Sequence, residues 1–330
     1  MYDIITIGAA VRDVFLRSAA WEVQKDPKSP TGLEQCFPLG AKVPVDDIVF
    51  ATGGGATNAA ATFAKLGKLR TAAICRIGTD FGGDLIRKEI KQLGVDTTLI
   101  QRDPKRNTGY SLILLSGAGQ RTILVHRGAS AHLSEKELSW RRMKTKWFYI
   151  TSLGGNLALM RRVFTHAAAN GALVAWNPGS SELAHGAKKL RPLLKEATVL
   201  SLNSEEAAAL TDLPTRNVRG MLRSLSTTYG IPYVLITDGA RGAYLRAGNT
   251  TWFAKTRPVK AVNVTGAGDA FGSAFVAGLA LEENAPNALC LGMANAEGVI
   301  REMGAKNGIL TAVPPPTRLA KQFALQQIRL

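Results

Sequence analysis

The chain has 330 residues, of which 46% are hydrophobic and 20% charged, a length that suits one large domain or two small ones. This composition excludes a mostly disordered chain and the collagen-like and disulfide-scaffold classes. Lys and Arg number 41 against 25 Asp and Glu, which gives a formal net charge of +16. The basic residues stand in short scattered groups with no zinc-finger spacing, so we expect no nucleic-acid partner.

The cysteines and the first residues indicate the compartment. Cys36, Cys75 and Cys290 are odd in number and far apart, as expected for free thiols in a reducing compartment. Residues 1–8 form a short apolar run with an acidic residue at position 3, which is typical of a first strand and not of a signal peptide. No run approaches the roughly 18 apolar residues of a membrane helix. The sequence therefore predicts a cytoplasmic protein with no membrane partner.

Strand-like and helix-like segments alternate along most of the chain. This alternation predicts βαβ units, and therefore a mostly parallel sheet with helices on both faces. Apolar runs predict strands over residues 4–7, 71–77, 147–150, 172–176, 198–202 and 233–237. Helical spacing and terminal glycines predict helices over residues 56–66, 85–93, 157–169, 270–280 and 288–302.

Two stretches interrupt the alternation. Residues 14–50 contain no good helix and are punctuated by prolines. Strand patterns over 111–115 and 122–126 are joined by the glycine-containing residues 117–120, which is typical of a hairpin. We expect one α/β domain over residues 1–330 with a small β-sheet lid formed by about residues 14–50 and 109–127.

A glycine-rich turn, Asn-Val-Thr-Gly-Ala-Gly-Asp-Ala-Phe over residues 263–271, runs directly into a predicted helix. Small residues at positions 266–268 leave backbone N–H groups uncovered, and the helix N-terminus adds partial positive charge. The turn therefore suits an anion such as a transferring phosphoryl group. Asp269, at the mouth of this turn, could accept the proton of an attacking hydroxyl. The alternative is that Asp269 only caps the helix.

A second glycine turn, Gly-Gly-Gly-Ala-Thr-Asn-Ala-Ala over residues 53–60, opens another predicted helix. Close approach of the backbone at Gly54 and Gly55, with the Asn58 amide as donor and acceptor, would suit a polar ligand. A turn that requires a positive φ explains the glycines equally well. The two turns in this order, about 200 residues apart, carry more information than either alone.

With both turns present, the sequence resembles the ribokinase family, the PfkB-type carbohydrate kinases, over nearly its whole length. Asp13 follows the first predicted strand, where the family places a carboxylate that binds acceptor hydroxyls. The resemblance implies a ribokinase-like fold, with three α/β/α layers, a mostly parallel central sheet and a small β lid. Further matches are residues 78–83 (G-x-D-x-x-G), 203–206 (N-x-x-E), 237–242 (T-x-G-x-x-G), and the adenine-side residues 294–296 and 304–305.

The resemblance implies an ATP-dependent kinase that transfers the γ-phosphoryl group to a hydroxyl of a small ribose- or fructose-like sugar. Asp269 would be the general base, and the backbone of Gly266, Ala267 and Gly268 would bind the phosphoryl group. Asp13, Gly54, Gly55 and Asn58 would bind the acceptor. Asn203, Thr237, Gly239, Gly242, Gly268 and Asn295 would bind ATP, and Glu206 would orient a water on Mg²⁺.

Several of these residues have a structural alternative. Residues 203–206 also form a good capping box with Glu206 at its third position. Asp80 would equally serve to tie down a loop, and packing explains Asn295 as well as an adenine contact does.

Two departures from the family pattern concern a monovalent cation. Asn263 stands where many relatives have Asp, which removes a charge from the family's cation loop. Gly308 stands where ribokinases often have a serine near that ion. We therefore expect no strong activation by potassium.

The acceptor and the oligomeric state stay open. A nucleoside kinase is the first alternative, because aromatic residues of the lid region could hold a base: Phe15, Trp21 and Phe37. Lysines of the same region leave a sugar phosphate open as acceptor: Lys25, Lys28 and Lys42. The intact residues 266–269 argue against a non-catalytic sugar- or nucleotide-binding regulator. The edges of an exposed lid sheet would favour a homodimer through the lid.

Overall fold

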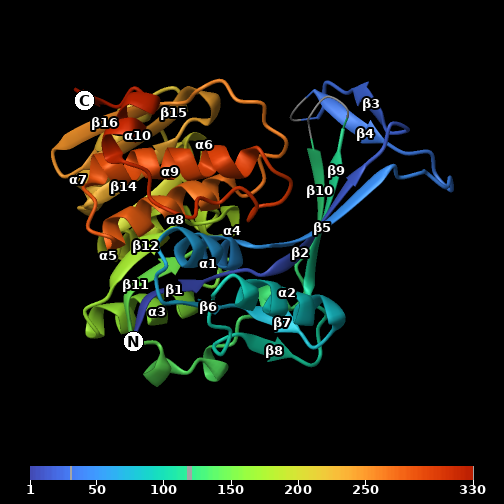
Figure 1. Ribbon diagram of the computed structural model, residues 1–330, viewed down its shortest axis with the longest axis horizontal. Coiled ribbons are helices and arrows are strands. Elements are labelled where there is room, and N and C mark those ends of the chain that lie inside the picture. The colour runs from blue at the N-terminus through green and yellow to red at the C-terminus, as the bar shows by residue number, and fades with distance from the viewer. Residues whose placement is uncertain (30–31, 117–120, 330) are drawn as a thin grey trace.

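The computed structural model describes residues 1–29, 32–116 and 121–329. A large sheet carries helices on both faces, and a small sheet stands away from it on one side (Figure 1). The expected fold class, three α/β/α layers with a mostly parallel sheet and a small second sheet, is confirmed. Over the described ranges, no helix combines the length and the apolar character that crossing a membrane requires.

The large sheet has nine strands in the order β17-β16-β15-β14-β13-β12-β11-β1-β6. Neighbours from β14 to β6 pair in parallel, whereas β15, β16 and β17 add an antiparallel extension beyond β14. The parallel strands are covered on both faces, which is why they read as continuous apolar runs. The strands are β1 (Tyr2–Ile7), β6 (Thr71–Ile74), β11 (Thr145–Ile150), β12 (Leu173–Trp176), β13 (Val199–Asn203), β14 (Tyr233–Thr237), β15 (Gly242–Ala247), β16 (Thr250–Lys255) and β17 (Gln326–Ile328).

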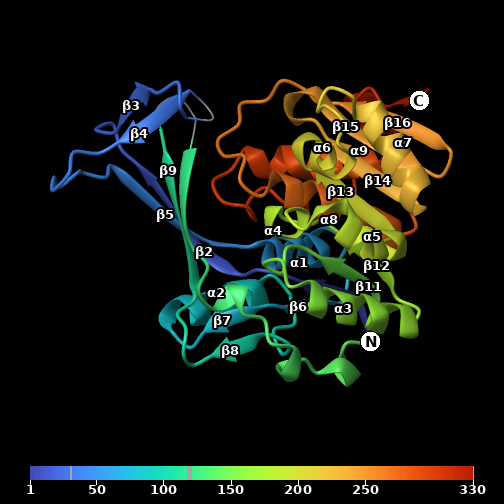
Figure 2. The ribbon, with the colours of Figure 1, turned by 180° about the vertical axis from the view of Figure 1, so that it is seen from behind.

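Helices cover both faces of the large sheet, and Figure 2 shows the face opposite to that of Figure 1. One core packs Phe63, Phe271 and Phe275 against the sheet. The opposite core includes Val163 and Leu222. The first face carries α1 (Gly55–Leu66), α8 (Ala267–Ala280), α9 (Ala285–Ile300) and α10 (Pro316–Gln322). The second carries α3 (Leu157–Ala169), α4 (Ser180–Leu183), α5 (Gly186–Glu196), α6 (Ser204–Thr211) and α7 (Val218–Tyr229).

The small sheet has the order β10-β9-β2-β5. A two-stranded ribbon of β3 and β4 lies at its far end (Figure 1). The predicted hairpin turn at 117–120 lies outside the described residues. The small sheet extends beyond the predicted bounds 14–50, since β2 begins at Val11 and β5 ends at Gly53. The strands are β2 (Val11–Arg17), β3 (Glu22–Lys25), β4 (Leu33–Cys36), β5 (Asp47–Gly53), β9 (Gly109–Leu115) and β10 (Arg121–His126).

The prediction of a single strand over residues 71–77 is wrong, because the strand is interrupted at Cys75. β6 stays in the large sheet, whereas β7 (Arg76–Gly78) pairs in parallel with β8 (Gln101–Asp103). Arg76 Nε donates to Asp103 Oδ2 at 3.0 Å across this pair. An apolar run in the sequence does not reveal this long-range ion pair. β7 and β8 lie below the small sheet, near α2 (Phe81–Gln92) (Figure 1).

Candidate active site

The turn that leads into α8 depends on glycine. Gly266 precedes the helix with φ of 80°, and a Cβ there would lie 2.3 Å from the Cβ of Ala305. A Cβ on Gly268 would meet no atom within 4 Å, so the first turn of α8 borders open space. The N-terminus of a helix carries partial positive charge and unpaired N–H groups. The turn is therefore open to an anion at this point.

Asp269 lies in the first turn of α8, and Gly266, not Asp269, is the residue that precedes the helix. Its Oδ2 accepts a hydrogen bond from Asn58 Nδ2 at 2.8 Å. Burial raises the pKa of Asp269, whereas the Asn58 hydrogen bond and the charge of Lys306 act in the opposite direction. The alternative that Asp269 merely caps the helix is wrong.

Asn58 lies in the first turns of α1 and makes a second contact through its other amide atom. Lys306 Nζ donates to Asn58 Oδ1 at 2.5 Å and also to the carbonyl oxygen of Thr52. Lys306 belongs to the loop after α9, where sequence patterns pointed only to Gly304, Ala305 and Gly308. The lone lysine between these small residues was the signal that could have revealed it.

Asp13 lies in the middle of β2 and is 4% exposed. Burial raises the pKa of Asp13, while Lys306 and a hydrogen bond from Ser111 oppose that rise. A Cβ on Gly53 would lie 2.0 Å from Asp13 Oδ2, so only glycine fits beside this carboxylate. Asp13, Asn58, Asp269 and Lys306 thus form one group of side chains, which we call the Lys306 cluster.

The glycines at the start of α1 allow close packing beneath this cluster. Gly54 has φ of 95°, and a Cβ there would lie 2.4 Å from the carbonyl oxygen of Ala9. A Cβ on Gly55 would lie 2.7 Å from Thr151 Oγ1. Gly54 therefore lets α1 approach the backbone that links β1 and β2, and Gly55 lets it approach the Thr151 side chain just after β11.

Asn203 and Thr237 are register partners at the carboxyl ends of β13 and β14. Asn203 caps α6: its Oδ1 accepts from the Glu206 N–H at 2.8 Å, and its own N–H donates to Glu206 Oε2 at 2.9 Å. The capping box is confirmed. Burial raises the pKa of Glu206, and the charge of Asp269 raises it further, although the Asn203 N–H opposes both.

The loop after β14 places two predicted glycines near this point. Gly239 has φ of 54° and open space around it. Gly242 has φ of 141°, and a Cβ there would lie 2.3 Å from the carbonyl oxygen of Ala254. The loop backbone at Gly239 is therefore not covered by a side chain at the end of β14. Gly242 allows β15 to approach β16 closely.

Asn295 does not join the other predicted nucleotide residues at the surface, because its side chain is 0% exposed. Its Nδ2 donates to the carbonyl oxygen of Ala270 at 2.9 Å, and its Oδ1 accepts from the Leu310 N–H at 3.0 Å. The residue ties α9 to α8 and to the loop after α9. Asn295 therefore has the packing role that the sequence left open as an alternative to an adenine contact.

Asp80 ties down a loop. Its Oδ1 accepts from the Gly83 N–H at 2.9 Å and from Thr108 Oγ1 at 2.6 Å. Its Oδ2 accepts from the Thr108 N–H at 2.7 Å. These hydrogen bonds cap α2 and fix the chain just before β9, so Asp80 supports the small sheet from below.

Glu206 is the candidate residue for holding a Mg²⁺ ion through water. Within the residues that the structure describes, no three His, Cys, Asp or Glu side chains gather as a metal site. Mg²⁺ that arrives with a nucleotide keeps several waters and needs only one or two carboxylates beside the phosphates. Glu206 uses Oε2 for the Asn203 N–H. Its other oxygen suits a water of such an ion.

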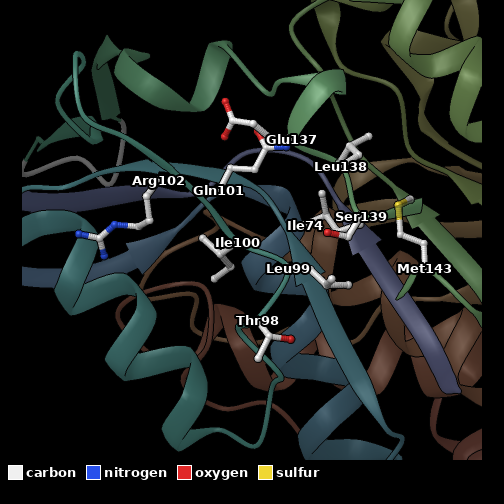
Figure 3. Close-up of a pocket in the computed structure, with 10 residues that line it drawn as sticks. All are labelled: Ile74, Thr98, Leu99, Ile100, Gln101, Arg102, Glu137, Leu138, Ser139 and Met143. Atoms are coloured by element: carbon white, nitrogen blue, oxygen red, sulfur yellow. The ribbon is translucent and has the colours of Figure 1, made fainter. Parts of the chain in front are cut away.

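A separate cavity of about 200 Å³ lies near the ends of β6 and β8 (Figure 3). Its charged side chains are engaged elsewhere, since Arg102 pairs with Asp84 and Glu137 pairs with Arg76. It contains none of the predicted site residues. Its lining consists of Ile74, Thr98, Leu99, Ile100, Gln101, Arg102, Glu137, Leu138, Ser139 and Met143.

A helix N-terminus open to an anion, with a carboxylate beside it on a three-layer α/β/α fold, is an arrangement suited to phosphoryl transfer. The chain belongs to the pfkB family of carbohydrate kinases, whose domain matches residues 32–312. It is accordingly an ATP-dependent sugar or nucleoside kinase.

Named relatives span both kinds of substrate. A ribokinase of Haemophilus influenzae is 28% identical over 79% of this chain and 85% of its own length. An aminoimidazole riboside kinase of Salmonella typhimurium is 28% identical over 81% of this chain and 86% of its own.

Solved structures share the fold. Arabidopsis thaliana ribokinase complexed with ribose and ATP has a TM-score of 0.76 at 21% identity, and the match covers 98% of both chains. An Escherichia coli protein described as a ribokinase II, in complex with ATP and Mg²⁺, has a TM-score of 0.76 at 20% identity, covering 98% of this chain and 100% of its own.

Proposed function

We propose that this kinase transfers the γ-phosphoryl group of ATP to a hydroxyl of a small ribose- or fructose-like sugar, with Asp269 as the general base. One observation carries the proposal: the Asn58 amide joins Asp269, beside the open N-terminus of α8, to the cluster that contains Asp13. Oδ2 of Asp269 is occupied by Asn58, so Oδ1 is the oxygen that would take the hydroxyl proton.

The phosphoryl group would lie at the N-terminus of α8. Backbone N–H groups of Gly266 and Gly268, together with the partial charge of the helix, would stabilise the charge on its equatorial oxygens. The Ala267 N–H donates to the Val264 carbonyl oxygen at 3.3 Å, so its use by the phosphoryl group would require that long hydrogen bond to open. The open space at Gly268 supports this placement. Mg²⁺, when bound, would neutralise phosphate charge, and Glu206 would orient one of its waters.

The remaining parts of ATP would lie along the ends of β13 and β14. Asn203 and Thr237 sit side by side there, and Gly239 leaves its loop bare. Gly242 would contribute by shaping that loop. We leave Asn295 out of this set, because its amide is fully buried and its hydrogen bonds are made within the protein.

The acceptor would lie between the small sheet and α1. Asp13 would accept hydrogen bonds from sugar hydroxyls, and Asn58 would hold the general base Asp269. Gly54 and Gly55 would contribute backbone atoms to the acceptor site, because a side chain at either position would collide with Ala9 or Thr151. The small sheet would act as a lid, formed by about residues 14–50 and 109–127 within a single domain. Its closure would exclude water and suppress hydrolysis of ATP.

A nucleoside acceptor is the second candidate, and the riboside kinase among the relatives favours testing it. The aromatic residues considered for a base pocket give it little support. Phe15 is 2% exposed and packs with Ile113 and Leu115. Trp21 and Phe37 pack edge to face with each other, with ring centroids 6.0 Å apart.

The experiment is an ADP-release assay across pentoses, hexoses, sugar phosphates and nucleosides, with Mg²⁺ and ATP fixed. We expect turnover with a free pentose or hexose. Turnover with nucleosides alone would replace the sugar proposal by the nucleoside candidate, and turnover with sugar phosphates alone would indicate that the lid lysines bind the acceptor. An Asp269→Asn preparation run in parallel separates this activity from contaminating kinases.

We also propose that potassium does not activate the enzyme strongly. Asn263 is buried, and its Oδ1 already accepts from the Thr265 N–H at 3.0 Å. Its Nδ2 has no partner among the described residues, and an amide N–H donor repels a cation. Rates in potassium and in tetramethylammonium salts should agree, and a large drop in the organic cation would contradict this proposal.

The cytoplasmic location stays a prediction. We further propose a homodimer through the small sheet. Leu124, Leu112 and Phe50 stand in one row across the sheet, on the face opposite to Asp13. They are 52%, 38% and 59% exposed, whereas Val14, which stands between Leu112 and Phe50 in the same row, is 5% exposed. A second copy would cover the exposed apolar side chains. Sedimentation of Phe50→Glu against wild type tests this: the wild type should be dimeric and the variant monomeric.

A further inference from the structure

Lys306 is a half-buried cation to which the proposed reaction assigns no role. Its ammonium has three N–H donors, and two of them bond to the carbonyl oxygen of Thr52 and to Asn58 Oδ1. Thr52 belongs to the small sheet, whereas Asn58 belongs to α1, so the lysine joins these two elements from the loop after α9. A lysine is rarely buried without a compensating partner.

The ammonium determines which way the Asn58 amide faces. Because an ammonium can only donate, it must meet the amide oxygen and not the amide nitrogen. The amide nitrogen is then directed to Asp269 Oδ2, at 2.8 Å. Without Lys306, the two orientations of the amide would be closer in energy, and one of them would place an oxygen against the carboxylate.

The charge of Lys306 also balances the carboxylates around it. Burial raises the pKa of Asp13 and of Asp269, and the positive charge of Lys306 lowers both. Burial lowers the pKa of Lys306 to about 8, while Asp13, Asp269 and Glu89 oppose that fall and Arg12 adds to it. Cys75 also faces this charge, but burial raises the pKa of its thiol to about 12.

We propose that Lys306 is a positioning residue for phosphoryl transfer, which orients the Asn58 amide toward Asp269 and keeps the Asp13 and Asp269 carboxylates ionised. This inference rests on the proposed function, because it assigns Lys306 a role through the base Asp269. The chain has no P-loop lysine. Lys306 therefore supplies a fixed cation on the acceptor side of the site, whereas Mg²⁺ and the α8 N-terminus act on the phosphate side.

The test compares Lys306→Met, which removes both charge and donor, with Lys306→Gln, which keeps a donor without the charge. Lys321→Met on the exposed side of α10 is the matched control for loss of one positive charge. An opposite charge nearby shifts the pKa of a carboxyl by one unit or more. We expect Lys306→Met to move the acid limb of kcat up by about one pH unit, a tenfold loss at low pH.

Two further readouts separate positioning from mere support of the fold. The difference between wild type and Lys306→Met in the ionised fraction of Asp269 should be confined to the acid limb, and it should vanish where the carboxyl is fully ionised in both proteins. In the background of Asn58→Ala, Lys306→Met should cost kcat less than it does alone, because the two residues act as a unit. Lys306→Gln should recover part of the loss at high pH and keep the shifted acid limb.

A titration of the Asp269 carboxyl by ¹³C NMR, assigned with Asp269→Asn, does not depend on any acceptor. If that titration shifts in Lys306→Met but no sugar or nucleoside is phosphorylated by the wild type, the proposed function fails and the electrostatic role stands. A folded Lys306→Met with wild-type kcat and an unmoved acid limb overturns the inference alone. So does a loss of kcat with an unchanged Asp269 titration, because that result reports only a structural role.

Discussion

Replacement of Asp269 by asparagine tests the proposed base with little disturbance of its surroundings. The substituted amide can keep its carbonyl oxygen toward Asn58 Nδ2, so the hydrogen bond of 2.8 Å survives. The other oxygen becomes an NH₂ group, which cannot take a proton from an acceptor hydroxyl. Loss of a general base typically slows a reaction by about 10² to 10⁴, which corresponds to roughly 3 to 5 kcal/mol of activation free energy.

The assay is ADP release at saturating acceptor, with ATP affinity measured separately by calorimetry. We expect kcat to fall by at least about a hundredfold while ATP still binds. Asp84→Asn is the matched control, since Asp84 also lies in the first turn of a helix but is exposed and pairs with Arg102 at 2.6 Å. It should retain the wild-type rate. If Asp269→Asn keeps more than about a tenth of the wild-type kcat, Asp269 is not the base.

Four further predictions concern stability and its link to function. Gly266→Ala should destabilise the fold by about 1 to 3 kcal/mol in denaturant unfolding, because of its positive φ and the 2.3 Å approach to Ala305. Gly268→Ala, with nothing within 4 Å, should fold normally and instead weaken ATP use, so equal stability losses in both variants would contradict the geometry. Asn295→Ala should cost about 2 kcal/mol or more by leaving buried backbone groups unpaired, with the KM for ATP unchanged in steady-state kinetics. Burial alone would raise the pKa of Asp103, but its hydrogen bonds and arginine partners lower it to about 2. The depressed pKa stabilises the fold above about pH 4, and that contribution is lost as the pH falls toward 2, so unfolding of Asp103→Asn and wild type should differ at pH 7 and converge near pH 2.

The sequence identified the class of fold because its main signal is local. Apolar runs mark the strands that are covered on both faces, and the two glycine turns mark helix starts that need small residues. Gly266 illustrates this well: its positive φ and its contact with Ala305 both demand glycine. Such positions leave a trace in the sequence whatever surrounds them.

Long-range pairing left no such trace. β7 separates from β6 at Cys75 and pairs with β8, where Arg76 bonds to Asp103, 27 residues further along the chain. The antiparallel strands β15 to β17 have no long apolar run. In the segment between β12 and β14, the start of α6 was indicated only by the capping box at residues 203–206. The helices α4, α5 and α7 were not predicted, and α5 carries Pro192 in its interior.

By itself, the sequence determined the fold class, the kinase family and the candidate carboxylate beside the helix N-terminus, since each rests on short local motifs and, for the family, on their order along the chain. Only the tertiary structure decided the roles of Asn295 and Lys306. Burial directs the Asn295 amide inward, and the meeting of β5, α1 and the loop after α9 places the Lys306 ammonium against Asn58. Hydrogen bonds between residues more than 200 positions apart follow from packing, and no local pattern encodes them.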